Sequence, residues 1–255
     1  MTDVMGKVYL IGAGPGAADL ITLRGARLLG QADVVLFDAL TDPALRDLAP
    51  AARWIDVGKR GFTHATRQTA INALLVRCAQ QHARVVRLKG GDPSLFGRLE
   101  EELEALAAQG IDCEVVPGVS AALAAAAAAR RPLTRRGRGR SVAFSTAMTQ
   151  EGDLRASRSA DSEVFYMAGR QLGALSRRLR AAGWPADTPV CVVSRAGWSD
   201  QLVSDHRVDG LAQATVLHAG RPTVVTVGAA AGAVAPRSKT LTVDRHPAAE
   251  TTASN

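Results

Sequence analysis

Short apolar runs rich in β-branched residues alternate with helical patterns from Lys7 to about Ala129. This alternation is typical of βα units and predicts an α/β fold with a parallel sheet. Five units are predicted, with strands from Val8 to Ile11, Val34 to Phe37, Trp54 to Val57, Val85 to Leu88 and Glu114 to Val116. The helical patterns that follow them cover Leu23 to Leu29, Ala44 to Leu48, Ala70 to Ala79, Glu100 to Ala108 and Ala121 to Ala129.

A second α/β domain is predicted after an arginine-rich break. The run from Ala129 to Arg140 holds Pro132, two glycines and six arginines, and the N-terminal domain is predicted to end at residue 137. The C-terminal domain spans 138–235, and a short polar turn between two of its strands predicts a mixed sheet. Its predicted strands are Ser141 to Ser145, Val164 to Tyr166, Val190 to Val193, Gln201 to Ser204 and Thr223 to Val227, with helices at Leu172 to Ala182 and Val208 to Leu217. Residues 236–255 are expected to form a disordered tail.

The composition allows a full hydrophobic core and indicates an acidic partner. The chain has 255 residues, 47% of them hydrophobic, and a formal net charge of +7. A surplus of Lys and Arg raises the local concentration of anions. Aromatic residues make up only 4% and no base-reading motif is present, so nucleic acid is not the expected partner. No signal peptide or membrane span is recognised, and a soluble, cytoplasmic protein is expected.

The cysteines and histidines do not indicate a metal site. Three cysteines are far apart in the sequence, and five histidines lack HxH or HExxH spacing. Neither structural zinc, nor a disulfide framework, nor a catalytic metal is expected. The polar stretch 62–69 is expected to be a mobile loop, with Arg67 or Gln68 at the start of the next helix.

Two glycine-rich loops are expected at strand ends. The first is Gly12-Ala13-Gly14-Pro15-Gly16-Ala17, which lets backbone approach a ligand closely. It also satisfies the dinucleotide pattern GxGxxA, with Asp38 where a ribose-binding acid would stand, so a Rossmann NAD-dependent oxidoreductase is a serious alternative. Pro15 stiffens this loop, and the next helical pattern begins near Thr22, too late for a helix N-terminus to hold a pyrophosphate.

The second loop is Lys89-Gly90-Gly91-Asp92-Pro93, directly after the fourth strand. Open parallel sheets bind ligands at the carboxyl ends of their strands, and a Rossmann domain does not need this second loop. Two such loops could hold the two ends of an extended ligand. A simple tight turn, with Asp92 as a local cap, is the alternative.

Six motifs occur in order along the chain, namely VYLIGAGPG, VVLFDAL, VGKR, VVRLKGGDP, FGR followed by acidic residues, and VVPGVSAALA. Together they resemble the tetrapyrrole methylase superfamily, most closely its uroporphyrinogen-III C-methyltransferase branch. The likeness is strong over residues 7 to 140 and continues weakly through Phe165 to Met167 and Val190 to Ala196. It implies a two-domain α/β enzyme, usually a homodimer, that binds S-adenosylmethionine and a polycarboxylated tetrapyrrole between its domains.

The resemblance also implies roles for individual residues. Asp38 matches the proposed proton acceptor and Lys59 the proposed proton donor, while Arg98, Glu101 and Arg136 match polar positions that face the substrate. Around S-adenosylmethionine it places Pro15, Gly90, Gly91, Asp92, Leu95, Ser120, Ala121, Met167 and Ala196. Plainer interpretations stay open, namely a turn or helix cap for Asp38 and solvated charges for Lys59, Arg98 and Glu101.

The expected substrate is a polyanion, for which the chain offers many arginines. Guanidinium groups bind carboxylates bidentately. The candidates are Arg98, Arg130, Arg131, Arg135, Arg136, Arg138 and Arg140, although the last two could also belong to a solvated linker. This substrate class would account for the basic net charge.

The chain departs from the family pattern on the substrate side. Ser94 replaces an aromatic residue, Leu99 and Glu100 replace two glycines, Arg135 replaces a histidine, and Ser194-Arg195 replace a Glu-Asn pair. The methyl-donor loops are intact, so substrate identity is affected more than methyl transfer. Other corrin-ring methylases, and more distantly diphthine synthase or ribosomal RNA methylases, stay open. A basic nucleic-acid-binding module is the remaining alternative from another class.

Overall fold

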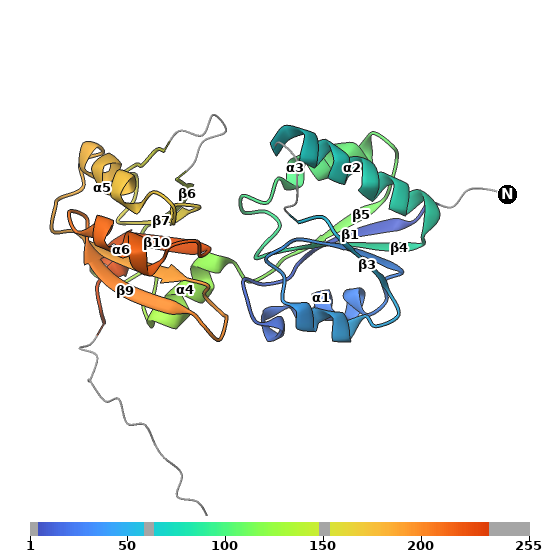
Figure 1. The fold of residues 1–255 in the computed structure, drawn as a ribbon, viewed down its shortest axis with the longest axis horizontal. Helices are drawn as coiled ribbons and strands as arrows, with labels where there is room; N and C mark the ends of the chain where they lie inside the picture. The colour runs from blue at the N-terminus through green and yellow to red at the C-terminus, as the bar shows by residue number, and fades with distance from the viewer. Residues whose placement is uncertain (1–4, 59–63, 148–153, 235–255) are drawn as a thin grey trace, which may run out of the picture.

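The computed structural model describes residues 5–58, 64–147 and 154–234. Two α/β units lie side by side, each built around a five-stranded sheet (Figure 1). No helix in these ranges is long and apolar enough to cross a membrane.

The first sheet is parallel throughout, as the βα pattern predicts. Its strands lie in the order β3-β2-β4-β1-β5, so the central strand β4 is flanked by β2 and β1. The strands are β1 (Lys7–Gly12), β2 (Val34–Phe37), β3 (Arg53–Asp56), β4 (Arg84–Lys89) and β5 (Cys113–Val116). Helices α2 (His64–Gln81) and α3 (Leu99–Ala107) cover one face, and α1 (Leu23–Leu29) covers the other (Figure 1).

Alternating residues of these strands build two separate cores. Val8, Leu10 and Val85 pack with α2 and α3, while Ile11 and Val86 pack with α1 and the 3-10 helix η2 (Pro43–Leu48). Successive strand residues point to opposite faces, so a sheet covered on both faces reads as a continuous apolar run. All strands of the first sheet end at the same edge.

The second sheet is mixed, as predicted. Its order is β6-β7-β10-β8-β9; β6 pairs with β7 in parallel, and the other pairs are antiparallel. The strands are β6 (Val142–Thr146), β7 (Ser162–Tyr166), β8 (Pro189–Ser194), β9 (Leu202–Arg207) and β10 (Thr223–Gly228). Helices α5 (Leu172–Ala181) and α6 (Ala214–Leu217) lie on one face, and α4 (Ala121–Ala129) lies on the other (Figure 1).

Helix α4 packs on the second sheet, although the sequence analysis assigned it to the N-terminal domain. Ala122 and Ala125 lie in one buried cluster with Cys191 and Val193 of β8. Alanine side chains let the helix backbone approach the sheet closely. By packing, the change from the first unit to the second therefore comes before Ser120 rather than at residue 137.

Three other elements differ from the predictions. Helix α2 begins at His64, three or four residues before the start expected at Arg67 or Gln68, because the polar residues there hid the periodicity. The predicted helix at Ala44 to Leu48 is the 3-10 helix η2. The predicted helix at Val208 to Leu217 is shorter and divides into η3 (Leu211–Gln213) and α6, preceded by Gly210, a poor helix former. The short helices η1 (Ala18–Leu20) and η4 (Ala229–Ala231) were not predicted.

Candidate active site

The two glycine loops meet at the carboxyl edge of the first sheet. Gly14 and Gly91 exchange backbone hydrogen bonds, with N···O distances of 3.3 and 2.8 Å. Just before them, the Ala13 N–H donates to the Lys89 carbonyl at 2.8 Å. Pro15 lies in the first loop. Helix α1 begins only after this loop, with Thr22 as its N-cap, as the sequence predicts. Both motifs therefore lie where parallel sheets bind ligands.

The loop between β5 and α4 packs against the glycine loops too closely for side chains. A Cβ atom added to Gly118 would lie 2.4 Å from the Gly91 carbonyl oxygen. Asp92 joins the loops, because its Oδ2 accepts from the Gly118 N–H at 2.9 Å and its Oδ1 from the Ser94 N–H at 2.8 Å. Leu95 follows in the same loop and donates its N–H to the Asp92 carbonyl at 3.3 Å.

The start of α4 contacts the end of β7. The Ser120 Oγ lies 2.5 Å from the Tyr166 hydroxyl and accepts the Ala122 N–H at 3.3 Å as the N-cap of α4. The Phe96 ring packs against Tyr166 with centroids 5.0 Å apart. Met167 follows Tyr166 and is 54% exposed. The expected donor positions Ser120 and Met167 are thus brought together through Tyr166, to which the sequence analysis assigned no role.

The loop after β8 contacts the first glycine loop from the second unit. The Ala17 N–H donates to the Gly197 carbonyl at 2.9 Å. A Cβ atom on Gly16 would lie 2.7 Å from the Ala196 carbonyl oxygen. Ala196, expected near the methyl donor, is buried at this contact.

Strained backbone is concentrated at the same edge. Four non-glycine residues in these loops have left-handed φ angles, namely Phe96 at 53°, Arg98 at 55°, Met167 at 58° and Arg195 at 50°. Such conformations cost free energy and are often found at ligand-binding sites. Their clustering here supports a binding function for this edge.

Asp38 follows β2 at this edge and pairs with a buried cation that the sequence analysis did not identify. Its Oδ1 lies 2.6 Å from Nη2 of Arg87 on β4. Arg87 also donates Nε–H to Oε1 of Glu102 at 2.8 Å, and Lys89 donates to Oε2 of Glu102 at 2.7 Å. Arg87, Lys89 and Glu102 are at most 4% exposed. The sequence does carry a signal for this network. Arg87 and Lys89 stand two residues apart at the end of an apolar strand, so they share the face of the sheet on which Val85 is buried.

Burial and charge act in opposite directions in this network. Burial disfavours the charged guanidinium of Arg87, but Asp38 and Glu102 outweigh it, and the net shift of the Arg87 pKa is upward. For Lys89, burial and the nearby Arg87 outweigh Glu102, and the Lys89 pKa is lowered. The network holds two cations and two carboxylates, so its formal charges balance.

The comparisons with known proteins agree with this architecture. The family model for tetrapyrrole (corrin/porphyrin) methylases matches residues 7–212. The chain belongs to the tetrapyrrole methylase family. A uroporphyrinogen-III C-methyltransferase from Pseudomonas aeruginosa is 45% identical over 200 residues, which cover 77% of this chain and 82% of that protein. A siroheme synthase from Pseudomonas paraeruginosa is 44% identical over 232 residues, 88% of this chain and 50% of that protein, so this chain spans about half the length of that relative.

Solved structures of the tetrapyrrole methylase family have the same fold. A uroporphyrin-III C-methyltransferase from Thermus thermophilus, complexed with S-adenosylhomocysteine, has a TM-score of 0.77 at 35% identity. The match covers 88% of this chain and 97% of that one. A cobalt precorrin-4 methyltransferase has a TM-score of 0.78 at 29% identity and covers 89% of this chain and 96% of that one.

The donor loops of this tetrapyrrole methylase fit a ligand that approaches the backbone. Gly91 has a φ of +74°, and a Cβ atom added there would meet no atom closer than the Ala121 backbone nitrogen at 3.9 Å. No described group accepts a hydrogen bond from the Ala121 N–H, which is free to bind a ligand atom in that space. Gly90 lies in the same loop beside Leu40. The described residues contain no group of His, Cys, Asp or Glu that could hold a metal ion.

Other expected catalytic residues lie nearby or outside the described ranges. Arg98 and Glu101 pair across the first turn of α3, with N···O distances of 2.6 and 2.7 Å and 43% exposure of each side chain. They belong to the same turn of α3 as Glu102, which is part of the network of Asp38, Arg87 and Lys89. Lys59 lies outside the described residues.

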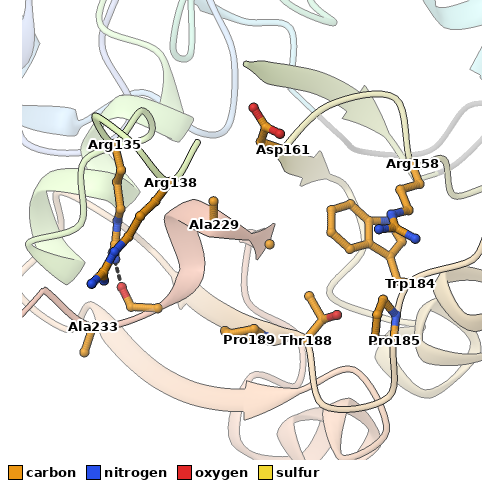
Figure 2. A pocket seen from close by; sticks show the side chains of 12 residues that line it. Arg135, Arg138, Arg158, Asp161, Trp184, Pro185, Thr188, Pro189, Ala229 and Ala233 are labelled. Atoms are coloured by element: carbon orange, nitrogen blue, oxygen red, sulfur yellow. Dashed lines mark hydrogen bonds between the residues drawn. The ribbon is translucent and has the colours of Figure 1, made fainter. Parts of the chain in front are cut away.

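Arg136 is not brought to this site, contrary to the expectation for a substrate-binding residue. It stands in an exposed turn closed by the Arg135–Gly139 bridge. A depression of about 420 Å³ beside this turn is lined by Pro189 and Gly228, which lie at the start of β8 and the end of β10 (Figure 2). Ser194, at the opposite end of β8, lies near the glycine loops. The six-residue strand β8 therefore separates the turn that carries Arg136 from the glycine loops within one chain.

Two arginines of the run from Ala129 to Arg140 make their contacts within the second unit. Arg135 donates to the carbonyls of Ala230 and Gly232, and its side chain points down beside Arg138 in Figure 2. Arg131 is buried and pairs with Asp205 of β9 at 2.6 Å. Arg135 therefore contributes to packing at the far end of the second sheet.

The substitution at Ser194 has a local structural explanation. Its Oγ lies 2.8 Å from His218 Nδ1 and accepts from Arg221 Nε at 3.0 Å. The next residue, Arg195, stacks over the Trp198 ring at 4.4 Å. Both side chains bind within the second unit, where they stabilise the loop that carries Ala196.

Proposed function

We propose that this chain transfers methyl groups from S-adenosylmethionine to carbons 2 and 7 of uroporphyrinogen III, giving precorrin-2 by way of precorrin-1. The observation that supports it most is the meeting of the two glycine loops, the Ser120 turn and Asp38 at one sheet edge. A relative with 35% identity and the same fold carries S-adenosylhomocysteine in its structure. S-adenosylhomocysteine is what the methyl donor becomes after transfer.

The chemistry requires alignment more than a powerful base. The sulfonium methyl of the donor is already activated, and the pyrrole carbons of a reduced tetrapyrrole are electron-rich, so in-line displacement depends on positioning. After transfer, a proton must leave the ring system. Asp38 is proposed to accept it, and assistance of this kind typically contributes about 10²- to 10⁴-fold. Lys59 is proposed to donate a proton back to the tetrapyrrole where the ring protons are redistributed after transfer.

Arg98 is proposed to bind a substrate carboxylate. It is half-exposed, follows the donor loop at the start of α3, and is held by its two hydrogen bonds to Glu101. Arg136 from the same chain is too far along the second sheet to do so.

A second candidate function is methylation of a later corrin intermediate. It is favoured by the likeness to cobalt precorrin-4 methyltransferase and by Ser94, which is exposed at the edge of the donor loop where the family has an aromatic residue. A Rossmann oxidoreductase is disfavoured because Thr22, the N-cap of α1, comes too late for that helix to hold a pyrophosphate at the glycine turn.

Release of S-adenosylhomocysteine tests the proposal. Anaerobic incubation with the methyl donor should release it at a rate that depends on the uroporphyrinogen III concentration. Release that needs a later corrin intermediate instead would favour the second candidate, and no release with any tetrapyrrole would contradict both. We further propose a homodimer that acts in the cytoplasm; a monomeric mass in solution light scattering would contradict the dimer.

A further inference from the structure

The guanidinium group of Arg87 is held by four separate acceptors. Its Nε donates to Glu102 at 2.8 Å and its Nη2 to Asp38 at 2.6 Å. Its Nη1 donates to the carbonyls of Leu88 at 3.2 Å and Leu36 at 3.5 Å. The side chain is 3% exposed. Every nitrogen is therefore engaged, and the planar group has one orientation.

The two oxygens of Asp38 stand in different surroundings. Oδ1 is bound to Arg87, whereas Oδ2 accepts no hydrogen bond from the described residues. The Asp38 side chain is 32% exposed, so Oδ2 can reach solvent or a ligand at the sheet edge. The Asp38 backbone is also fixed, since its carbonyl accepts from the Thr41 hydroxyl at 2.7 Å. One oxygen is thus held in place and the other is available to take a proton.

We propose that Arg87 is a positioning residue that orients the Asp38 carboxylate for proton transfer, with Glu102 and Lys89 fixing Arg87 in turn. This inference rests on the function proposed for Asp38. Glu102 binds both cations through its two oxygens, and it comes from α3, whose N-cap is Arg98 and whose first turn holds Glu101. The network therefore sets the distance between the proposed proton acceptor and the proposed substrate contact.

A purely structural role for Arg87 makes a different prediction. A buried ion pair between β4 and α3 could serve only to hold the helix on the sheet. Loss of such a pair would disturb donor binding and turnover together, whether or not Asp38 is present. The two roles are separated by asking whether the effect of changing Arg87 depends on the Asp38 carboxylate.

Arg87→Met is the informative change. It leaves Lys89 and Glu102 as a matched pair in the interior, and it leaves Asp38 at the partly exposed edge, so no buried charge is left unpaired. Methionine fills the apolar part of the space. Arg87→Lys is the second variant, which keeps the charge but cannot bind Asp38 and Glu102 in the same planar geometry.

The experiment is a double-mutant cycle of Arg87→Met and Asp38→Asn, with turnover of uroporphyrinogen III and S-adenosylhomocysteine affinity measured for each protein. We expect Arg87→Met to lower kcat by about 10- to 100-fold, as misplacement of a reacting group does. The affinity for S-adenosylhomocysteine should stay within about twofold of the parent protein. In the Asp38→Asn background, the same change should lower kcat by less than about twofold further.

Each outcome decides between the roles. Equal losses of kcat in both backgrounds, or a parallel loss of donor affinity, would overturn the positioning role. Wild-type turnover by Asp38→Asn would instead refute the function proposed for Asp38. If Arg87→Met does not fold, the same cycle with Arg87→Lys applies the same criterion.

Discussion

Gly91 and Gly137 have the same φ of +74°, but only Gly91 lies opposite another element, the start of α4, with an open space between them. A Cβ atom on Gly91 would meet the Ala121 nitrogen at 3.9 Å, and one on Gly137 would meet nothing within 4 Å. Alanine at either position adopts the same unfavourable backbone conformation. Comparison of Gly91→Ala with Gly137→Ala therefore separates the effect of backbone strain from the effect of filling the space beside α4.

Gly91→Ala is expected to weaken binding of S-adenosylhomocysteine at least tenfold, because the methyl group enters the space assigned to the donor. Both Gly91→Ala and Gly137→Ala should lower the free energy of unfolding by about 1–2 kcal/mol through strain. Calorimetric titration and urea unfolding measure the two quantities. Equal donor affinity in the two variants would show that the donor does not lie against Gly91.

His218 predicts how stability changes with pH. Burial, with His206 and Arg221 nearby, lowers the pKa of His218 from 6.5 to about 4. Its two ring nitrogens are hydrogen-bonded to the hydroxyl oxygens of Ser194 and Ser204, each at 2.8 Å. The unfolded chain therefore binds a proton below pH 6.5 that the folded protein does not bind until about pH 4. Stability is lost as the pH falls through this window.

We expect the free energy of unfolding to fall by about 2 kcal/mol through this group between pH 7.5 and pH 5. His218→Gln keeps an amide that can bond to Ser194 and Ser204 but does not titrate. Urea unfolding of both proteins at the two pH values should show a smaller loss for the variant. Identical losses would mean that His218 is not the group that titrates.

Arg98→Ala and Arg136→Ala test where the substrate binds. Arg98→Ala should raise KM for the tetrapyrrole about tenfold with little change in KM for the donor, as loss of a charged hydrogen bond does. Arg136→Ala should leave both KM values unchanged, because the turn that carries it lies at the far end of β8. Steady-state kinetics with each substrate varied in turn measures both. A raised tetrapyrrole KM for Arg136→Ala alone would place the substrate at that end, or at a contact with a second copy.

The packing of α4 on the second sheet can be tested by its stability. Ala125 is buried against that sheet, and Ala125→Leu should cost about 1–3 kcal/mol through overpacking. Ala127 is exposed on the same helix, and Ala127→Leu should change stability by less than about 0.5 kcal/mol. Thermal and urea unfolding of the two variants provide the comparison. Equal costs would contradict the assignment of Ala125 to the core.

The sequence predicts most of the fold because its signals are local. The apolar run Val34–Phe37 and the helical pattern that begins near Thr22 each carry their own periodicity. The start of α2 at His64 was missed because a polar helical turn has no apolar stripe. The sheet on which α4 packs was also missed, since a helix of eight alanines and Leu123 has no polar face to orient it.

The site was predictable where backbone shape defines it and not where distant residues meet. Glycine loops can be recognised in the sequence, because glycine is favoured where the backbone takes a positive φ, as it does at Gly91. The Arg87–Asp38 pair joins neighbouring strands far apart in sequence, so no spacing reveals it. The place of Arg136 was not predictable, because a run of arginines indicates anion binding without saying at which end of a sheet the run lies.

Mass analysis of the tetrapyrrole after anaerobic reaction with methyl-labelled S-adenosylmethionine tests the central claim most directly. We predict that uroporphyrinogen III gains two labelled methyl groups, by way of a singly methylated intermediate. A protein that binds S-adenosylhomocysteine but leaves uroporphyrinogen III unmethylated would contradict the claim, and would make Ser94, Leu99 and Glu100 the first residues to examine for a different tetrapyrrole substrate.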